Sequence, residues 1–220
     1  MSTADAKLRI DSSSVDSSVE PPKFYQHPNS LVESEQVGDG TRIWAFAQVM
    51  KGAVVGKNVN VGGHAFVESG AVVGDNVTIK NQVLIWEGVT IQDDVFIGPR
   101  VAFTNDRFPR SPRSSGASER YDAKENWLEK TVVCRGASIG AGVTIAPSCT
   151  LGCGCMVAAG SVVTSDVPAF ALVVGVPARR IDDVCACGQR LRGKYNEVNC
   201  AACGETAAAR QEIANSYASN

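Results

Sequence analysis

A strict period of six residues runs through most of the chain. From Val37 to Phe103 every sixth residue is aliphatic, or finally aromatic, without exception. After an interruption the same spacing resumes at Val133 and continues to Val163. A period of six fits neither the 3.6 residues per turn of a helix nor the simple alternation of a hairpin. It is typical of a parallel β-helix, in which short strands meet at tight corners and successive coils stack.

The period also predicts how each position of a repeat is used. The aliphatic residue should point into a narrow interior, and a small apolar residue four positions later should also face inward. Glycine often follows the aliphatic residue, and we expect it at corners that need a positive φ or close approach between backbones. Three repeats make one triangular coil, so the two blocks predict about four and about two coils.

Length and composition agree with one core and additional segments. The chain has 220 residues, 44% of them apolar, which is enough for a substantial core. We expect a flexible leader at 1–22 and a β-helix domain at 23–183, with an insertion at 104–132. A zinc-ribbon-like segment at 184–205 and a tail at 206–220 should follow.

The charge and the first residues of the chain exclude several classes of partner. The net charge is −2 and no basic block is present, so nucleic acid is not an expected partner. The first twenty residues contain no apolar run, which argues against a secretory signal or a membrane anchor. A cytoplasmic protein that does not bind membranes is the expectation.

The cysteines divide into two groups. Cys149 and Cys155 fall at the inward small-residue position, where a thiol acts as a compact apolar group. Four others form two close pairs, each followed by glycine and separated by twelve residues: Cys185, Cys187, Cys200 and Cys203. Such pairs resemble the knuckles of a zinc ribbon, which hold one structural zinc through four thiolates. The first pair has one intervening residue where two are usual, so metal-free thiols and disulfides remain alternatives.

The interruption at 104–132 is the second informative feature. A long insertion in a solenoid leaves at one corner and commonly builds a binding face. Arg107, Arg110 and Arg113 could meet an anionic ligand. The alternative is a solvated loop whose arginines pair with its own acids.

Four stretches carry a family resemblance. They are Ile-Lys-Asn at 79–81, Phe-Thr-Asn-Asp-Arg-Phe-Pro-Arg at 103–110, Asp-Val-Pro at 166–168 and Val-Gly-Val-Pro-Ala-Arg at 174–179. With the repeats, they resemble the hexapeptide-repeat acyltransferases over residues 24–183, and most closely the N-acetyltransferases of nucleotide-linked 3-amino sugars. The resemblance implies an all-β fold, a left-handed parallel β-helix with a long loop insertion and a small Cys-rich C-terminal tail. It also implies a homotrimer, with acetyl-CoA in a groove between neighbouring β-helices.

His64 and Asn81 are the candidate catalytic residues. His64 precedes an inward alanine, so its ring can point outward, and an imidazole can accept a proton near neutral pH. The alternative is an ordinary surface histidine, since relatives that resemble this chain can carry asparagine there. Asn81 matches the asparagine that, in the family, hydrogen-bonds the reacting sugar, although asparagine also suits a plain corner. The remaining histidine, His27, precedes the coils and is expected to be structural.

The resemblance also suggests binding residues. It places the sugar near the insertion, where Glu68, Asn105, Asp106, Arg107 and Arg110 are the candidate contacts.

Ala141 and Ala159 are small enough to let the pantetheine arm of CoA approach the backbone. Arg179 and Arg180 could meet the CoA phosphates, or simply cap the end of the fold.

These residues predict acetyl transfer from acetyl-CoA to the 3-amino group of a dTDP- or UDP-linked amino-deoxy sugar, by direct attack of the amine on the thioester. One alternative is an O-acetyltransferase that uses His64 as its base. Another is a non-catalytic trimeric scaffold. A carbonic-anhydrase-like zinc site needs three histidines, and the chain has only two.

Overall fold

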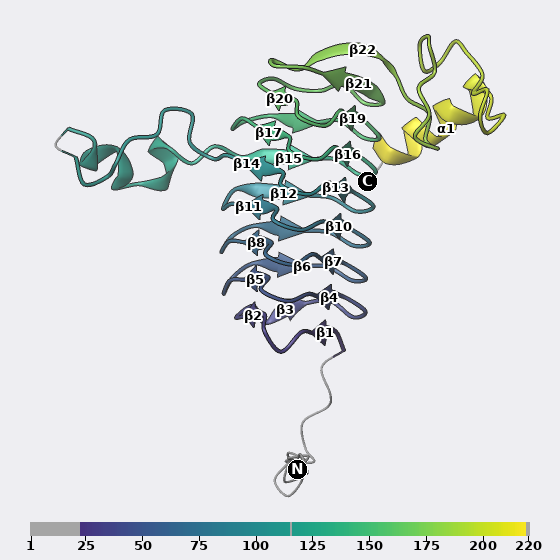
Figure 1. Cartoon of the computed structure of the whole chain (residues 1–220). Helices are drawn as coiled ribbons and strands as arrows, with labels where there is room; N and C mark the ends of the chain where they lie inside the picture. Colours follow the sequence, from purple (N-terminus) through teal and green to yellow (C-terminus); the bar gives the residue numbers. More distant parts are fainter. Residues whose placement is uncertain (1–22, 115, 219–220) are drawn as a thin grey trace, which may run out of the picture.

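The regular secondary structure consists almost entirely of short β-strands, most of them two or three residues long and joined by tight turns. A computed structural model describes residues 23–114 and 116–218, so the predicted leader at 1–22 lies outside the described residues. The strands stack as a tall three-sided column (Figure 1). This confirms the predicted fold class, a β-helix of hexapeptide repeats.

Three sheets form the three faces of the column. Face 1 contains β1 (Tyr25–Gln26), β4 (Arg42–Ile43), β7 (Asn60–Val61), β10 (Thr78–Ile79), β13 (Phe96–Ile97), β16 (Ser138–Ile139), β19 (Met156–Val157), β21 (Ala171–Val174) and β22 (Arg179–Asp183). Face 2 contains β2 (Leu31–Val32), β5 (Gln48–Val49), β8 (Phe66–Val67), β11 (Leu84–Ile85), β14 (Ala102–Phe103), β17 (Thr144–Ile145) and β20 (Val162–Val163). Face 3 contains β3 (Gln36–Val37), β6 (Val54–Val55), β9 (Val72–Val73), β12 (Val89–Ile91), β15 (Thr131–Val133) and β18 (Thr150–Leu151).

The predicted interior is the observed core. Ile79, Ile85 and Ile91 lie on faces 1, 2 and 3 of the same coil, and each is at most 1% exposed. Cys149 and Cys155 are buried at the inward small-residue position, as predicted. Burial of one such isoleucine stabilises a fold by about 1.5–3 kcal/mol, and this contribution repeats in every coil.

The column has more coils than the repeats predict. Face 1 alone contains nine strands, of which only β22 runs antiparallel, whereas about six coils were expected. The extra first coil was missed because Val32 and Val37 are five residues apart, which breaks the six-residue spacing. Val32 pairs with Val49 and Val37 with Val55, so the first coil is one residue shorter than the next.

Glycine after the inward aliphatic residue allows close approach between coils. A Cβ on Gly140 would lie 2.5 Å from the backbone nitrogen of Ala159, and one on Gly62 would lie 2.7 Å from that of Asn81. The left-handed backbone conformation falls instead two residues later, at His64 with φ 58° and Gly142 with φ 66°. Of the two reasons predicted for these glycines, close approach is therefore the one that applies.

Two segments depart from the column. The insertion leaves after β14, contains the 3-10 helices η1 (Ser118–Tyr121) and η2 (Lys124–Asn126), and returns at β15. It projects sideways from the coils (Figure 1). Beyond β22, the C-terminal segment ends in helix α1 (Ala207–Ala218), which falls where only a tail was expected. Within 23–114 and 116–218, no helix combines the length and apolar character needed to cross a membrane.

Gly140→Ala and Gly142→Ala separate the two roles of glycine. Gly140→Ala should lower the free energy of unfolding by about 3 kcal/mol, because the new methyl group meets the backbone of the next coil. Gly142 has open space around it, so Gly142→Ala should cost only about 1 kcal/mol, from its left-handed φ. Urea unfolding measures both values. Equal losses would contradict the close-approach account.

Candidate active-site cleft

The three edges of the column place the candidate residues. We define the His64 edge as the row of corners that join face 1 to face 2, and the insertion edge as the row that joins face 2 to face 3. His64 follows β7 and Asn81 follows β10, so both lie on the His64 edge in adjacent coils. Glu68 follows β8 and the insertion follows β14, so they share the insertion edge.

A cleft of about 580 Å³ opens beside the His64 edge. Its polar and aromatic lining consists of two imidazoles, two amides, an amine and two aromatic rings: His27, His64, Asn60, Asn81, Lys80, Trp44 and Phe46. The cleft therefore combines groups that accept or donate protons with flat apolar surfaces.

The backbone and a neighbouring ring hold His64 in place. Its left-handed φ of 58° turns the corner, and its backbone N–H donates to the Ala45 carbonyl at 3.3 Å. The imidazole stacks on Phe46, with ring centroids 4.9 Å apart and planes 22° apart. The ring is exposed, so its nitrogens remain accessible to a ligand in the cleft.

The structure adds His27 to the candidate residues. Its backbone N–H donates to the Ile43 carbonyl of the next coil. Trp44 and Gly62 make the equivalent hydrogen bond to the coils that follow them, so His27 lies at the first corner of the His64 edge. Its Nδ1 accepts a hydrogen bond of 3.1 Å from the Asn29 N–H, and this bond does not involve the other ring nitrogen, Nε2. The five-residue step after Val32 hides this alignment in the sequence.

Asn81 has its position because two glycines lie beneath it. A Cβ on Gly62 would lie 2.8 Å from Asn81 Oδ1, and a Cβ on Gly63 would lie 3.6 Å from Nδ2. Side chains at these positions would push the amide away. Lys80, which sequence reasoning did not assign a role, adds a positive charge to the same cleft.

Ala141 and Ala159 lie higher on the His64 edge, after β16 and β19. Ala141 is three coils above His64, a separation of roughly 14 Å for neighbouring strands about 4.8 Å apart. Beside Ala159, a largely apolar groove of about 370 Å³ is lined by Phe96, Met156 and Leu172. Only a long ligand could contact both this groove and the His64 cleft.

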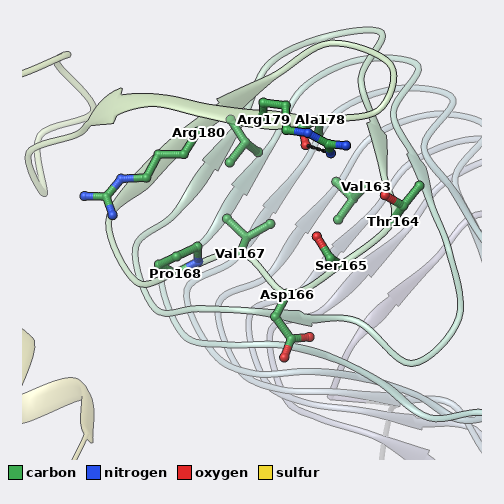
Figure 2. Close-up of a pocket in the computed structure, with 10 residues that line it drawn as sticks. Val163, Thr164, Ser165, Asp166, Val167, Pro168, Ala178, Arg179 and Arg180 are labelled. Carbon is green, nitrogen blue, oxygen red and sulfur yellow. Dashed lines mark hydrogen bonds between the residues drawn. The ribbon is translucent and has the colours of Figure 1, made fainter.

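Arg179 and Arg180 line a different cavity, of about 390 Å³, together with residues 163–168 at the last coil. Arg179 Nη1 donates to the Ala178 carbonyl at 2.8 Å, and Arg180 Nη2 pairs with Asp183 at 2.5 Å. Figure 2 shows Arg180 extending away from Ser165 and Asp166. The two arginines are therefore not beside Ala141 and Ala159, and their contact with CoA phosphates stays a prediction.

A polar chain on the insertion edge joins the coils to the insertion. Glu68 Oε2 accepts the Glu87 N–H at 2.8 Å, and the Glu87 carbonyl accepts Asn105 Nδ2 at 3.2 Å. Lys124 pairs with Glu87 Oε1 at 2.5 Å. Glu68 and Asn105 are thus close together, but face 2 separates them from His64.

Asp106 holds the insertion together. Its carboxylate pairs with Arg120 at 2.6 Å and accepts hydrogen bonds from the Tyr121 hydroxyl at 2.8 Å and the Phe108 N–H at 2.9 Å. Burial alone would raise the pKa of Asp106, but the hydrogen bonds from Arg120, Tyr121 and Phe108 lower it below its usual value. Its predicted contact with the sugar would have to compete with these bonds.

The two other candidate arginines differ in their surroundings. Arg107 pairs with Glu129 at 2.9 Å and donates to the Pro147 carbonyl at 3.2 Å, as the solvated-loop alternative supposed. The side chain of Arg110 is exposed, and its Nη1 donates to the Pro109 carbonyl at 3.0 Å. Arg110 is thus better placed than Arg107 to meet an external anion.

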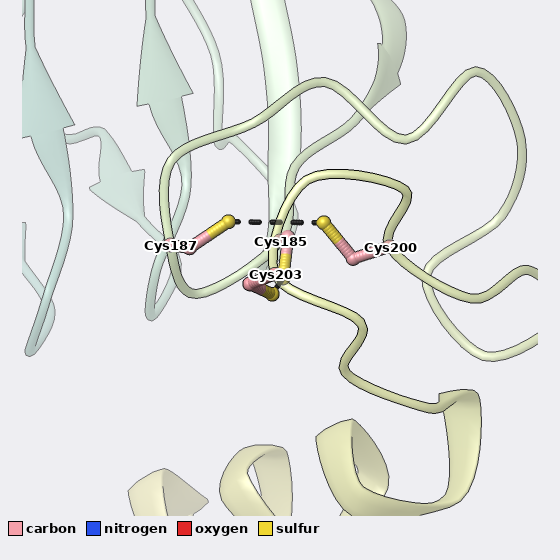
Figure 3. Close-up of side chains that lie close together, drawn as sticks. All are labelled: Cys185, Cys187, Cys200 and Cys203. Carbon is pink, nitrogen blue, oxygen red and sulfur yellow. Dashed lines mark hydrogen bonds between the residues drawn. The ribbon is translucent and has the colours of Figure 1, made fainter.

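Four cysteines meet beyond β22. The sulfurs of Cys185, Cys187, Cys200 and Cys203 all lie within 4.8 Å of one another (Figure 3). Backbone N–H groups of Cys203 and Ala202 lower the pKa of Cys200 to about 6, whereas burial raises the pKa of Cys185. This cluster follows β22 and lies outside the column of coils.

The sequence matches one family of known proteins and, over most of its length, one relative. Residues 36–69 match the family described as bacterial transferase hexapeptide (six repeats). The chain is 46% identical over 184 residues to the dTDP-3-amino-3,6-dideoxy-α-D-galactopyranose 3-N-acetyltransferase of Aneurinibacillus thermoaerophilus. That alignment covers 82% of this chain and 88% of the relative.

Solved structures are similar at lower identity. One is a point mutant of perosamine N-acetyltransferase from Caulobacter crescentus in complex with CoA and GDP-perosamine, at 20% identity and a TM-score of 0.49, covering 73% of this chain. Another is the acetyltransferase domain of PglB from Neisseria gonorrhoeae FA1090 with acetyl coenzyme A, at 19% identity and a TM-score of 0.47, covering 72% of this chain. The chain spans 57% and 58% of these two structures.

Asp106→Asn should loosen the insertion without unfolding the column. Loss of the charge-assisted bonds to Arg120 should cost about 1.5 kcal/mol, so amide exchange in the insertion should speed up about tenfold. The effect should depend on pH. Because its folded-state pKa is lowered, Asp106 stabilises the insertion above its usual pKa of 3.8, and this stabilisation is lost as the pH falls through the lower folded value.

Hydrogen exchange followed by mass spectrometry measures this effect. Asp122→Asn, which changes an exposed acid of the same insertion, is the matched control. Equal exchange rates in the two variants at neutral pH would contradict the role assigned to Asp106.

Proposed function

The chain belongs to the hexapeptide-repeat acyltransferases, among the N-acetyltransferases of nucleotide-linked 3-amino sugars, and we propose its substrate and mechanism from this membership. The proposed reaction moves an acetyl group from acetyl-CoA to the 3-amino group of a dTDP-linked 3-amino-3,6-dideoxyhexose. The relative from Aneurinibacillus thermoaerophilus supports this substrate class. A UDP-linked amino sugar is the second choice. The proposed location is the cytoplasm.

The observation that carries the proposal is the convergence of His27, His64 and Asn81 on one cleft. Acetyl transfer forms a bond between the amine nitrogen and the acetyl carbon, and it breaks the bond between that carbon and sulfur. The amine must be unprotonated and aimed at the carbonyl. In the proposed mechanism, the Asn81 amide orients the amine without competing for its proton, and His64 receives the proton as the new bond forms. The CoA thiolate then leaves and takes a proton from solvent.

The shape of the His64 edge supports a long, thin donor. In the proposed pose, the pantetheine arm runs along the edge past Ala141 and Ala159, and its acetyl end reaches the cleft. The apolar groove beside Ala159 suits such an arm, since Phe96, Met156 and Leu172 offer few polar groups. Lys80 at the lower end supplies positive charge for the nucleotide pyrophosphate.

The division of the candidate residues between two edges supports a homotrimer. Within one chain, Glu68, Asn105 and Arg110 lie on the insertion side of face 2 and do not reach His64. A second copy could place its insertion edge against the first copy's His64 edge, and the projecting insertion would then cover the cleft (Figure 1). Three copies joined in this way close a ring.

O-transfer to a sugar hydroxyl is the second candidate function, and the two imidazoles in the cleft favour it. A neutral amine can attack the thioester without help from a base, whereas a hydroxyl must lose its proton as it attacks. O-transfer therefore depends more strongly on a base. The two functions can therefore be separated by removing His64.

The first test is a thiol-release assay with acetyl-CoA and a panel of dTDP- and UDP-linked sugars. Release should be fastest with a dTDP-linked 3-amino sugar and absent with its 3-hydroxy counterpart. If none of the 3-amino sugars releases CoA, the proposed function is wrong.

The second test is His64→Asn. Asparagine tolerates the left-handed φ of this corner, so the fold should survive. N-transfer should fall by about 100-fold, whereas an O-transferase that depends on the base should lose nearly all activity. Asp94→Asn is the matched control, because it changes a left-handed corner with φ 61° on the third edge, away from the cleft. It should keep wild-type kcat. Unchanged kcat in His64→Asn would contradict a role for His64 in proton transfer.

A further inference from the structure

The four C-terminal cysteines have the spacing of a tetrahedral metal site. The sulfur–sulfur distances are 3.7 Å between Cys185 and Cys203 and 3.7 Å between Cys187 and Cys200, and all four sulfurs lie within 4.8 Å of one another. Zinc–sulfur bonds of about 2.3 Å in a tetrahedron require sulfur–sulfur distances of about 3.8 Å. The sulfurs converge on one point between the two loops (Figure 3). A disulfide would bring one pair to about 2.05 Å, which none of them approaches.

Each loop that carries two of the sulfurs is closed by a hydrogen bond from its glycine to the carbonyl of its first cysteine, over three residues in the first loop and four in the second. In the first loop, the N–H of Gly188 donates to the Cys185 carbonyl at 2.8 Å, and Gly188 has φ 88°. In the second, the N–H of Gly204 donates to the Cys200 carbonyl at 2.9 Å, and Gly204 has φ 75°. Each glycine allows the chain to reverse directly after the second cysteine of its pair. The unusual single residue between Cys185 and Cys187 therefore still permits a closed turn.

The segment around these cysteines has too small a core to fold alone. Its buried cluster consists of Phe170, Cys185, Leu191, Tyr195 and Cys200, and two of these five are themselves members of the sulfur cluster. Segments below about 40 residues usually need a disulfide or a metal to hold their structure. A zinc ion would supply that cross-link here.

We propose that Cys185, Cys187, Cys200 and Cys203 bind one structural zinc ion, which fastens the C-terminal segment to the last coil of the β-helix. The four thiols give up their protons to solvent as they bind the ion. Four sulfur ligands fill a tetrahedral zinc, so no position is open for substrate or water, and the ion takes no part in acetyl transfer.

The contacts around the cluster show what the ion would hold together. Cys185 lies two residues after the end of β22, which pairs with β21 of the last coil, so one ligand is tied to the column. Tyr195, between the two loops, stacks on Phe170 of that coil at 3.9 Å. Arg210 of α1 is fully buried and donates to the Tyr195 and Glu205 carbonyls. The segment therefore packs against the side of the last coils (Figure 1).

Glu205 is an acidic group beside the sulfurs that could compete for the ion, since its Oε2 lies 2.9 Å from Cys185 Sγ. The four sulfurs already complete a tetrahedral set, so we assign the ligand role to Cys185 and not to the carboxylate. Glu205→Gln, which keeps the size of the side chain, should therefore retain zinc.

The experiment measures metal content and structure in the full-length protein, apart from enzyme activity. Protein purified under reducing conditions should contain one zinc per chain. After the zinc is removed with a chelator, one equivalent of Co²⁺ should give the strong visible absorption of a tetrahedral thiolate complex, and zinc should abolish it. Removal of the metal should increase amide exchange across 184–218 while leaving the coils protected.

Two variants and one control make the result decisive. Cys187→Ser and Cys203→Ser change the two exposed cysteines of the cluster, so loss of zinc from them is not a consequence of a disrupted core. Cys134→Ser, in the coils, should bind zinc as the wild type does. Wild-type protein with no more zinc than Cys187→Ser, or with a disulfide between any two of the four cysteines, would overturn the proposal. So would equal zinc in all of these proteins.

Discussion

The stacking of aliphatic side chains in a narrow interior is the constraint on which the rest of the structure depends. Because each face must present one inward residue per coil, residues eighteen positions apart pair on the same face, as Ile79 does with Ile97. Residues between the inward positions face outward, and those at equivalent positions of successive coils lie one above another. His64 and Asn81 therefore share an edge, although the core specifies nothing about their chemistry.

The six-residue period predicts which side chains face the interior of the column. It placed Ile79, Ile85 and Ile91 in one coil and buried Cys149 and Cys155 inside. It could not place His27 in the cleft, because a five-residue step shifts the first coil. It also could not decide between the two interpretations of the insertion, which depend on long-range pairs such as Asp106 with Arg120. Helix α1 carries no comparable period, so it was not predicted.

The His64 edge, the insertion and the cysteine cluster have separable roles in the proposed enzyme. The His64 edge carries the cleft, and its small residues leave a path toward the last coils. The insertion is held together by two internal ion pairs, Asp106 with Arg120 and Arg107 with Glu129. In the proposed homotrimer it would cover a neighbouring copy. The cysteine cluster follows β22, and its segment packs beside the last coils (Figure 1). In the proposed enzyme, acetyl transfer, assembly and attachment of the C-terminal segment would therefore depend on different residues.

A crystal structure of the protein with CoA and a dTDP-linked 3-amino sugar would show whether both ligands meet at the His64 edge. We expect the sugar nitrogen within hydrogen-bonding distance of His64 or Asn81, and the pantetheine arm along Ala141 and Ala159. We also expect a second copy's insertion to face the same ligand. A sugar bound instead in the cavity beside Arg179, or a CoA that never touches the His64 edge, would contradict the account.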